Sequence, residues 1–370
     1  MTTRYVAIRR GATGTSAGDI AKQEFNYKTF EGVTVNGDPS DIEPIAHFLD
    51  QTSEDIGQDR GLIFPETSAQ RVMRNKIAGQ VAVSGDIQVP LYPTGTTTMI
   101  YYAMGLRSTE GSNHRITNRN TAPRVFQMRL GKDRRPHQYV GCVVRTMTID
   151  YDPSEVVLVT FGIMCNRELK TFPAFKPNYT QGNKNESYYT LGKYKAGTGN
   201  PGDYNIADRA FGGVEIDVFA KKGNTSGAWS NGDMVKNVES FNIEVDNGFI
   251  DDNYVIGDRH LPNAYIQNFT VNGSMELGYS DNSDYVAVLN EQYQRYRFLA
   301  GYGSGGTRRK VDVELPQIAL KTGNLPTEGT DRYLLNIDWE AERKGGTGAD
   351  KDDLIIIDVA NGESAAQIVK

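Results

Sequence analysis

Two stretches of this sequence decide the fold: VAVSGDIQV, residues 81–89, and FTVNGSMEL, residues 269–277. In each, apolar side chains occupy odd-numbered positions around a central glycine, and small or polar side chains occupy the even ones, which is typical of a β-strand with one buried face. The central glycines, Gly85 and Gly273, are 188 positions apart (273 − 85), about half of the 370-residue chain. An offset of this size predicts two copies of one domain.

The likeness continues on both sides of these strands. Upstream, SEDIGQDRGLI (53–63) resembles SFNIEVDNGFI (240–250). Downstream, hydroxyl side chains that can cap a helix predict helices over 96–105 and 283–299. Each copy should then end in two strands. The expected strand pairs are 139–150 with 155–165 in the first copy, and 310–320 with 333–340 in the second.

Composition supports a mainly β protein. The chain is 38% hydrophobic and 23% charged and has 39 glycines, which is typical of a folded, loop-rich protein. It has no apolar run of about 18 residues, and MTTRYVAIRR lacks the apolar core of a signal peptide, so we expect no membrane anchoring. We predict two tandem β-sandwich or partial-barrel domains, each with a short flanking helix.

The expected domain boundaries follow shifts in composition. Residues 1–50 should form an N-terminal arm with a strand at Tyr5–Ile8 and a short helix over Ser40–Asp50, and 107–122 should be a polar loop in the first domain. The predicted segments are 1–50 (arm and helix), 51–170 (first domain), 171–234 (Gly/Asn/Tyr-rich linker or interface loop), 235–345 (second domain) and 346–370 (C-terminal strand and tail).

No motif for catalysis, cofactor binding or metal binding has the required context. The G-x-G-x-x-G at 301–306 follows an expected helix and precedes a strand, the reverse of the dinucleotide-binding arrangement. Asp150, Asp152 and Glu155 offer carboxylates without a recognisable pocket. None of the four histidines has zinc-ligand spacing. We therefore predict no enzyme activity, no cofactor and no metal site. Cys142 and Cys165 should be buried thiols rather than a disulfide framework.

Two groups of residues remain as candidate functional sites. The formal net charge of −6 argues against a protein that grips nucleic-acid phosphates. The polar positions of the two marker strands should share one face of a sheet; they are Ser84, Asp86, Gln88, Asn272, Ser274 and Glu276. Basic pairs and rigid aromatic rings are suited to contacts between subunits. These candidates are Arg134, Arg135, Tyr188, Tyr189, Arg308 and Arg309.

The chain resembles the major tail tube proteins of long-tailed, siphovirus-like bacteriophages. The resemblance rests on YVAI (5–8) followed by Gly14-Thr15, AGQVAVSGDIQV (78–89) leading to a helix that ends at Gly105, and VESFNIEVDNGF (238–249) followed by VNGSMEL (271–277). It spans nearly the whole chain but is carried by short motifs. The N-terminal region and residues 171–231 depart from the common pattern.

The resemblance implies a structural virion protein made in the bacterial host cytoplasm. Its domains would join into a β-barrel ring, and stacked rings would form the tail tube for genome delivery. Six domains per ring would need three duplicated chains, with six chains as the alternative. The implied partners are further copies of the chain, tape-measure and tail-tip or terminator proteins, and double-stranded DNA that passes without specific binding. If the six polar marker residues line the lumen, they would repel phosphates.

Two other functions stay open at this stage. Another phage tail or decoration protein, such as a terminator or baseplate subunit, would form a single ring or decorate a shell. A carbohydrate-binding β-sandwich or glycosidase should have an exposed aromatic platform, but the sequence has only Trp229 and Trp339, and Trp339 lies in a predicted core strand.

Overall fold

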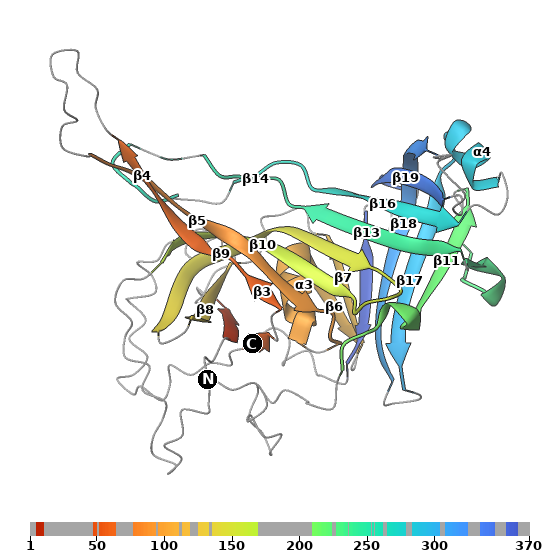
Figure 1. Ribbon diagram of the computed structural model, residues 1–370, viewed down its shortest axis with the longest axis horizontal. Coiled ribbons are helices and arrows are strands. Elements are labelled where there is room, and N and C mark those ends of the chain that lie inside the picture. Colours follow the sequence, from red (N-terminus) through yellow and green to blue (C-terminus); the bar gives the residue numbers. More distant parts are fainter. Residues whose placement is uncertain are drawn as a thin grey trace, which may run out of the picture.

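The computed structural model is mainly β (Figure 1). Among the residues that it describes, 18 strands connect into one sheet, and a further two form a hairpin. The described residues are 5–10, 47–49, 52–63, 77–93, 95–110, 113–118, 125–132, 135–168, 209–223, 227–235, 237–252, 254, 256–261, 265–278, 283–303, 308–324, 334–344 and 353–361.

The N-terminal half of the sheet contains two layers that share one long strand. Its strands are β1 (Tyr5–Arg10), β2 (His47–Leu49), β3 (Ser53–Glu54), β4 (Gly57–Ile63), β5 (Ile77–Pro90), β6 (Gly105–Glu110), β7 (Asn113–Asn118), β8 (Phe126–Lys132), β9 (Arg135–Tyr151) and β10 (Leu158–Glu168). The first layer has the order β4-β5-β10-β9. The other layer has the order β2-β1-β8-β9, so β9 passes from one layer to the other.

The C-terminal half has the same strand order. Its strands are β11 (Ile216–Lys222), β12 (Met234–Val235), β13 (Val238–Asp246), β14 (Phe249–Ile250), β15 (Tyr265–Ile266), β16 (Thr270–Gly278), β17 (Gln294–Tyr302), β18 (Arg309–Asn324), β19 (Leu334–Ala341) and β20 (Ile356–Ala360). One layer is β13-β16-β19-β18 and the other is β12-β11-β17-β18. Here β18 takes the place that β9 has in the first half.

Two pairings between described strands join the halves. β9 pairs antiparallel with β13 from Thr146↔Asp246 to Tyr151↔Phe241, which makes one continuous layer, β4-β5-β10-β9-β13-β16-β19-β18. We call the β9–β13 junction the seam. The C-terminal strand β20 lies between β18 and β7 and so connects the second layer of one half to the other half. The two halves therefore share strand pairings as well as the chain connection.

Buried aromatic side chains anchor the seam from the core side. Tyr151 ends β9, and its ring stacks on Phe298 of β17 with 5.3 Å between centroids. Phe241 of β13 lies 3.9 Å from Phe298 and 5.4 Å from Trp339 of β19. Offset contacts of this kind add about 1 kcal/mol each beyond the area that they bury. Trp339 is buried, as the alternation along its strand predicts.

The described helices are short, and the structure corrects one of the two expected ones. α3 (Gly95–Met104) confirms the first. α4 (Ser283–Leu289) is shorter than expected, because residues 294–302 form β17. In β17, Gln294, Tyr296, Phe298 and Ala300 are buried and alternate with more exposed residues. The helix expected over 283–299 was therefore too long, because its last residues belong to a strand in which buried side chains alternate.

Three further expectations need correction. The end of the helix expected over 40–50 is strand β2, which pairs with β1. The polar loop expected at 107–122 contains the β6–β7 hairpin, whose outer strand finds its partner in β20 at the far end of the chain. Part of the expected linker 171–234 is ordered as the 3-10 helices η4 (Gly213–Glu215) and η5 (Asn231–Asp233) with β11 and β12. The rest of that segment lies outside the described residues.

Candidate functional site

One face of the continuous layer carries polar side chains on each of its strands. The opposite face carries the core, with Val83, Ile87, Ile149, Ile243 and Met275 all buried. Because side chains alternate between the faces of a strand, the residues between these positions point away from the core. We call this second surface the polar face.

The polar face contains all six marker residues named from the sequence. Ser84, Asp86 and Gln88 lie along β5, and Asn272, Ser274 and Glu276 lie along β16. The register carries the face from strand to strand, because Gln88 pairs with Thr160, Thr160 with Thr148, and Thr148 with Glu244. Glu244 in turn pairs with Asn272. The structure thus places both triads on one surface, on opposite sides of the seam.

Carboxylates outnumber basic groups on the described part of the polar face. The register adds acidic residues that the sequence analysis did not single out: Asp59, Asp150, Glu244, Asp246, Asp338 and Glu340. Lys321, at a bulge in β18, pairs with Glu340. Asn242 donates a hydrogen bond to Asp150 across the seam at 2.5 Å, and Thr322 donates one to Asp338 at 2.6 Å. The face therefore combines hydrogen-bonded polar rows with negative charge.

The carboxylate of Asp86 has a perturbed pKa. Partial burial and, second, the nearby negative charge of Asp55 raise the pKa of Asp86 above its ordinary value. The backbone N–H of Asp86 donates a 2.5 Å hydrogen bond to the Asp55 carboxylate, which holds the two acids together. A negative charge close to Asp86 disfavours ionisation of its carboxyl group.

The seam itself is fixed by buried polar contacts as well as by the strand ladder. Asn247, immediately after β13, is buried, and its amide donates hydrogen bonds of 2.9 Å to the carbonyls of Ala103 in α3 and Val144 in β9. Its backbone N–H donates to the carbonyl of Arg145 at 2.9 Å. A buried amide with its donors satisfied at three points fixes the register of the two halves.

The residues expected to contact other subunits have different outcomes. Arg309 is the first residue of β18, and Arg308, just before it, is exposed. Arg135 begins β9. The structure describes no more than the backbone of Arg135, and Arg134, Tyr188 and Tyr189 lie outside the described residues. Of these candidates, the side chains of Arg308 and Arg309 lie within the described residues, and they are neighbours at the start of β18.

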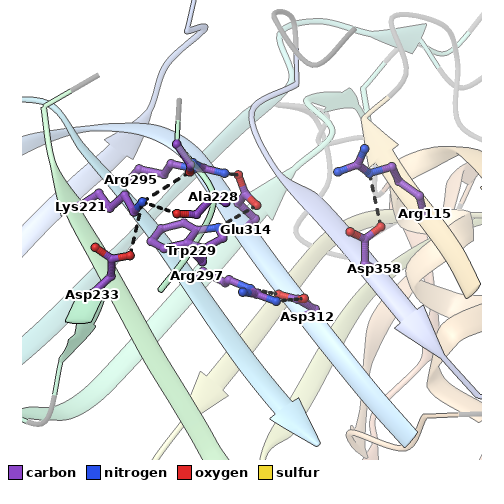
Figure 2. A network of polar contacts seen from close by, with 11 residues as sticks. Arg115, Lys221, Ala228, Trp229, Asp233, Arg295, Arg297, Asp312, Glu314 and Asp358 are labelled. Atoms are coloured by element: carbon purple, nitrogen blue, oxygen red, sulfur yellow. Dashed lines mark hydrogen bonds and ion pairs between the residues drawn. The ribbon is translucent and has the colours of Figure 1, made fainter. Parts of the chain in front are cut away.

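The sequence analysis missed a charged network on the second layer of the C-terminal half (Figure 2). Arg297 of β17 makes two hydrogen bonds to the buried carboxylate of Asp312 on β18, at 2.7 and 2.6 Å. Arg295 pairs with Glu314, and its guanidinium lies 4.4 Å from the centroid of Trp229. Scattered single charges on strands have no local signature, so only the cross-strand register reveals the network.

The network extends over the strand that joins the two halves. Arg115 of β7 pairs with Asp358 of β20 at 3.3 Å, beside the Arg297–Asp312 pair in Figure 2. Burial, and less strongly the neighbouring charge of Asp312, raise the pKa of Asp358 against the opposing effect of Arg115. The half-buried Trp229 is covered by Arg295 and Lys221 rather than presented as an open aromatic platform.

Chemical sites of other kinds are not supported by the described residues. Cys142 and Cys165 are free, buried and directly opposed on β9 and β10, as buried thiols were expected to be. Burial raises the pKa of the Cys142 thiol well above its usual value. Within the described ranges, no group of three or more His, Cys, Asp or Glu residues could hold a metal ion, and no helix is long and apolar enough to cross a membrane.

A two-layered β protein with a polar sheet face and open strand edges is typical of the class of structural, assembly-forming proteins. A sequence model described as "Phage tail tube protein" matches residues 65–341, which is 277 of 370 residues (341 − 65 + 1). The chain therefore belongs to the phage tail tube protein family and is a structural component of a phage virion. A search of curated proteins gives no match.

Proposed function

We propose that this chain is an internally duplicated tail tube protein that assembles into stacked rings, the conduit through which a long-tailed, siphovirus-like phage delivers its genome. The observation that carries the proposal is the seam: the chain already contains two equivalent four-strand sheets joined edge to edge into one layer. Continued edge to edge, such a layer closes into a barrel.

Matching irregularities support the duplication. The β9–β10 pairing shifts register between Gly162 and Ile163, and the β18–β19 pairing shifts between Leu320 and Thr322, opposite Trp339 and Asp338. The pairs Gly162–Ile163 and Asp338–Trp339 are related by one offset (338 − 162 = 176). A second bulge also recurs, between Phe126 and Met128 in β8 and between Gln294 and Tyr296 in β17. Bulges are positioned features, so two shared bulges favour common descent of the halves.

The duplication favours a ring of three chains. If each half contributes one of six equivalent sheets, three chains supply 3 × 2 = 6 and make a pseudo-sixfold ring, while a ring of six chains is the alternative. Closure also removes exposed sheet edges, which otherwise promote uncontrolled pairing. In this proposal the two domains are those expected from the sequence, residues 51–170 and 235–345.

We assign the polar face to the lumen. Ser84, Asp86 and Gln88, together with Asn272, Ser274 and Glu276, would then line the channel beside the acidic residues of the same face. Carboxylates repel DNA phosphates, and the face has no concentration of unpaired basic groups in its described part, so DNA would slide without specific binding. This function uses no catalytic group. Tape-measure and tail-tip or terminator proteins would contact the tube at its axis and ends.

Electron microscopy of the purified full-length chain tests the proposal. Negative-stain images at high protein concentration should show tubes with a central channel, and the mass of isolated rings should equal three chains, about 123 kDa from 3 × 40.9 kDa. Single rings that never stack would favour a terminator or baseplate role instead. A compact monomer under all conditions would contradict self-assembly.

A further inference from the structure

We propose that neighbouring chains join by repeating the seam: the free edge of β18 pairs with β4 of the next chain, and the β4–β5 hairpin of that chain lies over β16, β17 and β18. This inference rests on the proposed ring assembly and names the surfaces and the register that close it. The partner is a second copy of this chain.

The seam predicts the register of the new pairing. Within the chain, Thr146 of β9 pairs with Asp246 of β13. Thr146 lies opposite Gly162 and Thr322 lies opposite Asp338, so Thr322 is its counterpart (146 + 176 = 322). On the other side of the seam, Ser53 lies opposite Gln88 and Ser240 lies opposite Glu276. Ser53 and Ser240 are therefore counterparts, with an offset of 187 (240 − 53). The counterpart of Asp246 is then Asp59 (246 − 187 = 59).

The two edges are open in the described chain. β4 pairs with β5 on one side, and no described strand pairs with its other side. Residues 319–324 of β18 pair with β19 on one side, while the described partners β17 and β20 pair with earlier residues of β18. Asp59 and Thr322 are both exposed. Open edges of matching length and position are suited to pair with each other.

A second contact inside the chain indicates what the β4–β5 hairpin does. The segment that carries β14 and β15 runs from the C-terminal half toward the β4–β5 hairpin (Figure 1). It contacts the N-terminal half through hydrogen bonds from the Val81 N–H to the Arg259 carbonyl at 2.8 Å, and from Arg259 Nε to the Gly79 carbonyl at 2.6 Å. Phe249 and Leu261 of this segment are buried in one cluster with side chains of the N-terminal half: Val125, Val143 and Met164.

The counterparts of two members of this buried cluster, Phe249 and Val125, are exposed. Phe249 pairs with Ile266 as Leu62 pairs with Ala78, so Leu62 is the counterpart of Phe249 (249 − 187 = 62). Val125 directly precedes β8 as Tyr293 directly precedes β17. Phe249 and Val125 are each 6% exposed, whereas Leu62 is 47% and Tyr293 40% exposed. Phe249 and Val125 are therefore covered within the chain, whereas Leu62 and Tyr293 remain exposed in the single chain.

The side chains at the seam are more apolar than those at the corresponding positions of the open edges. At the seam, Met147 pairs with Val245, and both are fully buried. Their counterparts are Gly323 and Gln58 (147 + 176 = 323; 245 − 187 = 58). A glycine and an amide expose less apolar surface at an open strand edge than Met and Val side chains would, which lowers the risk of unspecific association.

Cysteine crosslinking in assembled full-length protein tests the register. Asp59→Cys combined with Thr322→Cys places thiols on directly opposed residues, where Cα atoms about 4.5–5.5 Å apart are suited to a disulfide. Mild oxidation should produce covalent dimers and trimers on non-reducing gels. The matched control combines Asp59→Cys with Asn324→Cys, which is displaced by two residues, so that the Cα atoms are about 7–8 Å apart. We expect about tenfold less crosslinking in the control.

The outcomes separate the seam from the proposed function. If tubes or rings form but the opposed pair crosslinks no better than the displaced pair, the proposed junction is wrong and the tube function stands. If the chain never assembles, both fail. Each single-cysteine variant and the wild-type chain, with its buried Cys142 and Cys165, give the background.

Two substitutions at counterpart positions give an independent test. Leu62→Glu should leave the unfolding midpoint of the unassembled chain unchanged and reduce assembly at least about tenfold, because Leu62 is exposed until a neighbour covers it. Phe249→Glu should instead lower the unfolding midpoint of the single chain, because Phe249 is already buried. Normal assembly of the Leu62→Glu protein would overturn the hairpin contact.

Discussion

Gly273 lies directly opposite Trp339 on the neighbouring strand, and a Cβ atom on Gly273 would lie 2.6 Å from Cζ2 of the indole. It would also lie 2.0 Å from the carbonyl oxygen of Asn242 on the other side. Gly85, its counterpart in β5, is similarly confined: a Cβ there would meet the backbone of Ile56 at 2.6 Å, and its φ of 155° is itself unfavourable for other residues. The two central glycines are therefore required by close backbone approach in both halves.

We predict that Gly273→Ala destabilises the chain by about 2 kcal/mol, because the backbone of β13 and the buried indole cannot both move away. Urea unfolding followed by Trp fluorescence measures the change. Gly232→Ala is the matched control, since the nearest atom to its added Cβ, Ser230 Oγ, is 3.7 Å away. A loss equal to that of the control would contradict the close approach.

Removal of one partner of the Arg297–Asp312 pair should lower the free energy of unfolding much more than replacement of both partners by apolar side chains. Arg297→Met leaves the buried carboxylate of Asp312 with the more distant Lys310 at 3.5 Å, and we expect a loss of about 2–3 kcal/mol in the free energy of unfolding. Arg297→Met combined with Asp312→Leu should lie within about 1 kcal/mol of wild type, because the uncompensated charge is gone. Chemical denaturation of the two single variants and the double variant completes the cycle. A double variant with a lower free energy of unfolding than either single variant would contradict this explanation.

The raised pKa of Asp86 makes a prediction about pH. The folded state binds its proton more tightly than the unfolded state, whose pKa is near 3.8, so ionisation of Asp86 disfavours folding as the pH rises through these values. Asp86→Asn should therefore be more stable than wild type at pH 7, by a few tenths of a kcal/mol because the side chain is exposed.

Well below pH 3.8 both states of the wild type are mostly protonated at this residue, and the advantage of Asp86→Asn should become small. Thermal unfolding of the two proteins between pH 3 and pH 7 measures the difference. Ser84→Ala, on the same face and without a titrating group, should give a difference that does not change with pH in this way. If the stability difference between Asp86→Asn and wild type increased as the pH falls, the prediction would be contradicted.

Charge reversal on the polar face should make the channel retain DNA. Asp150→Lys and Asp338→Lys, on the same cross-strand row, would replace repulsion of phosphates by attraction if that face lines the lumen. Assembled tubes of the double variant should retain double-stranded DNA at low salt and release it as salt increases. The control, Asp217→Lys, makes the same change on an exposed position of β11. Equal DNA retention by the control variant would contradict the assignment of the polar face to the lumen.

Local patterns were sufficient where one strand has one buried face. The alternation along β5, β16, β18 and β19 identified these strands, their buried sides and the common face of the six marker residues. It failed where a signal was mixed, as at residues 283–299, where a two-turn helix is followed at once by an alternating strand. It also failed for the polar β6–β7 hairpin, whose structure depends on pairing with β20 at a separation of more than 230 residues.

The sequence by itself determined that this is a mainly β chain and predicted two similar halves, because period-two alternation and the spacing of two similar stretches can be read without any tertiary contact. Only the tertiary structure decided which edges meet. The pairing of β9 with β13, the place of β20, the Arg297–Asp312 network and the open edges at β4 and β18 all depend on partners far apart in the chain. Strand edges present the same N–H and C=O groups everywhere, so the choice of partner comes from global packing rather than from local sequence.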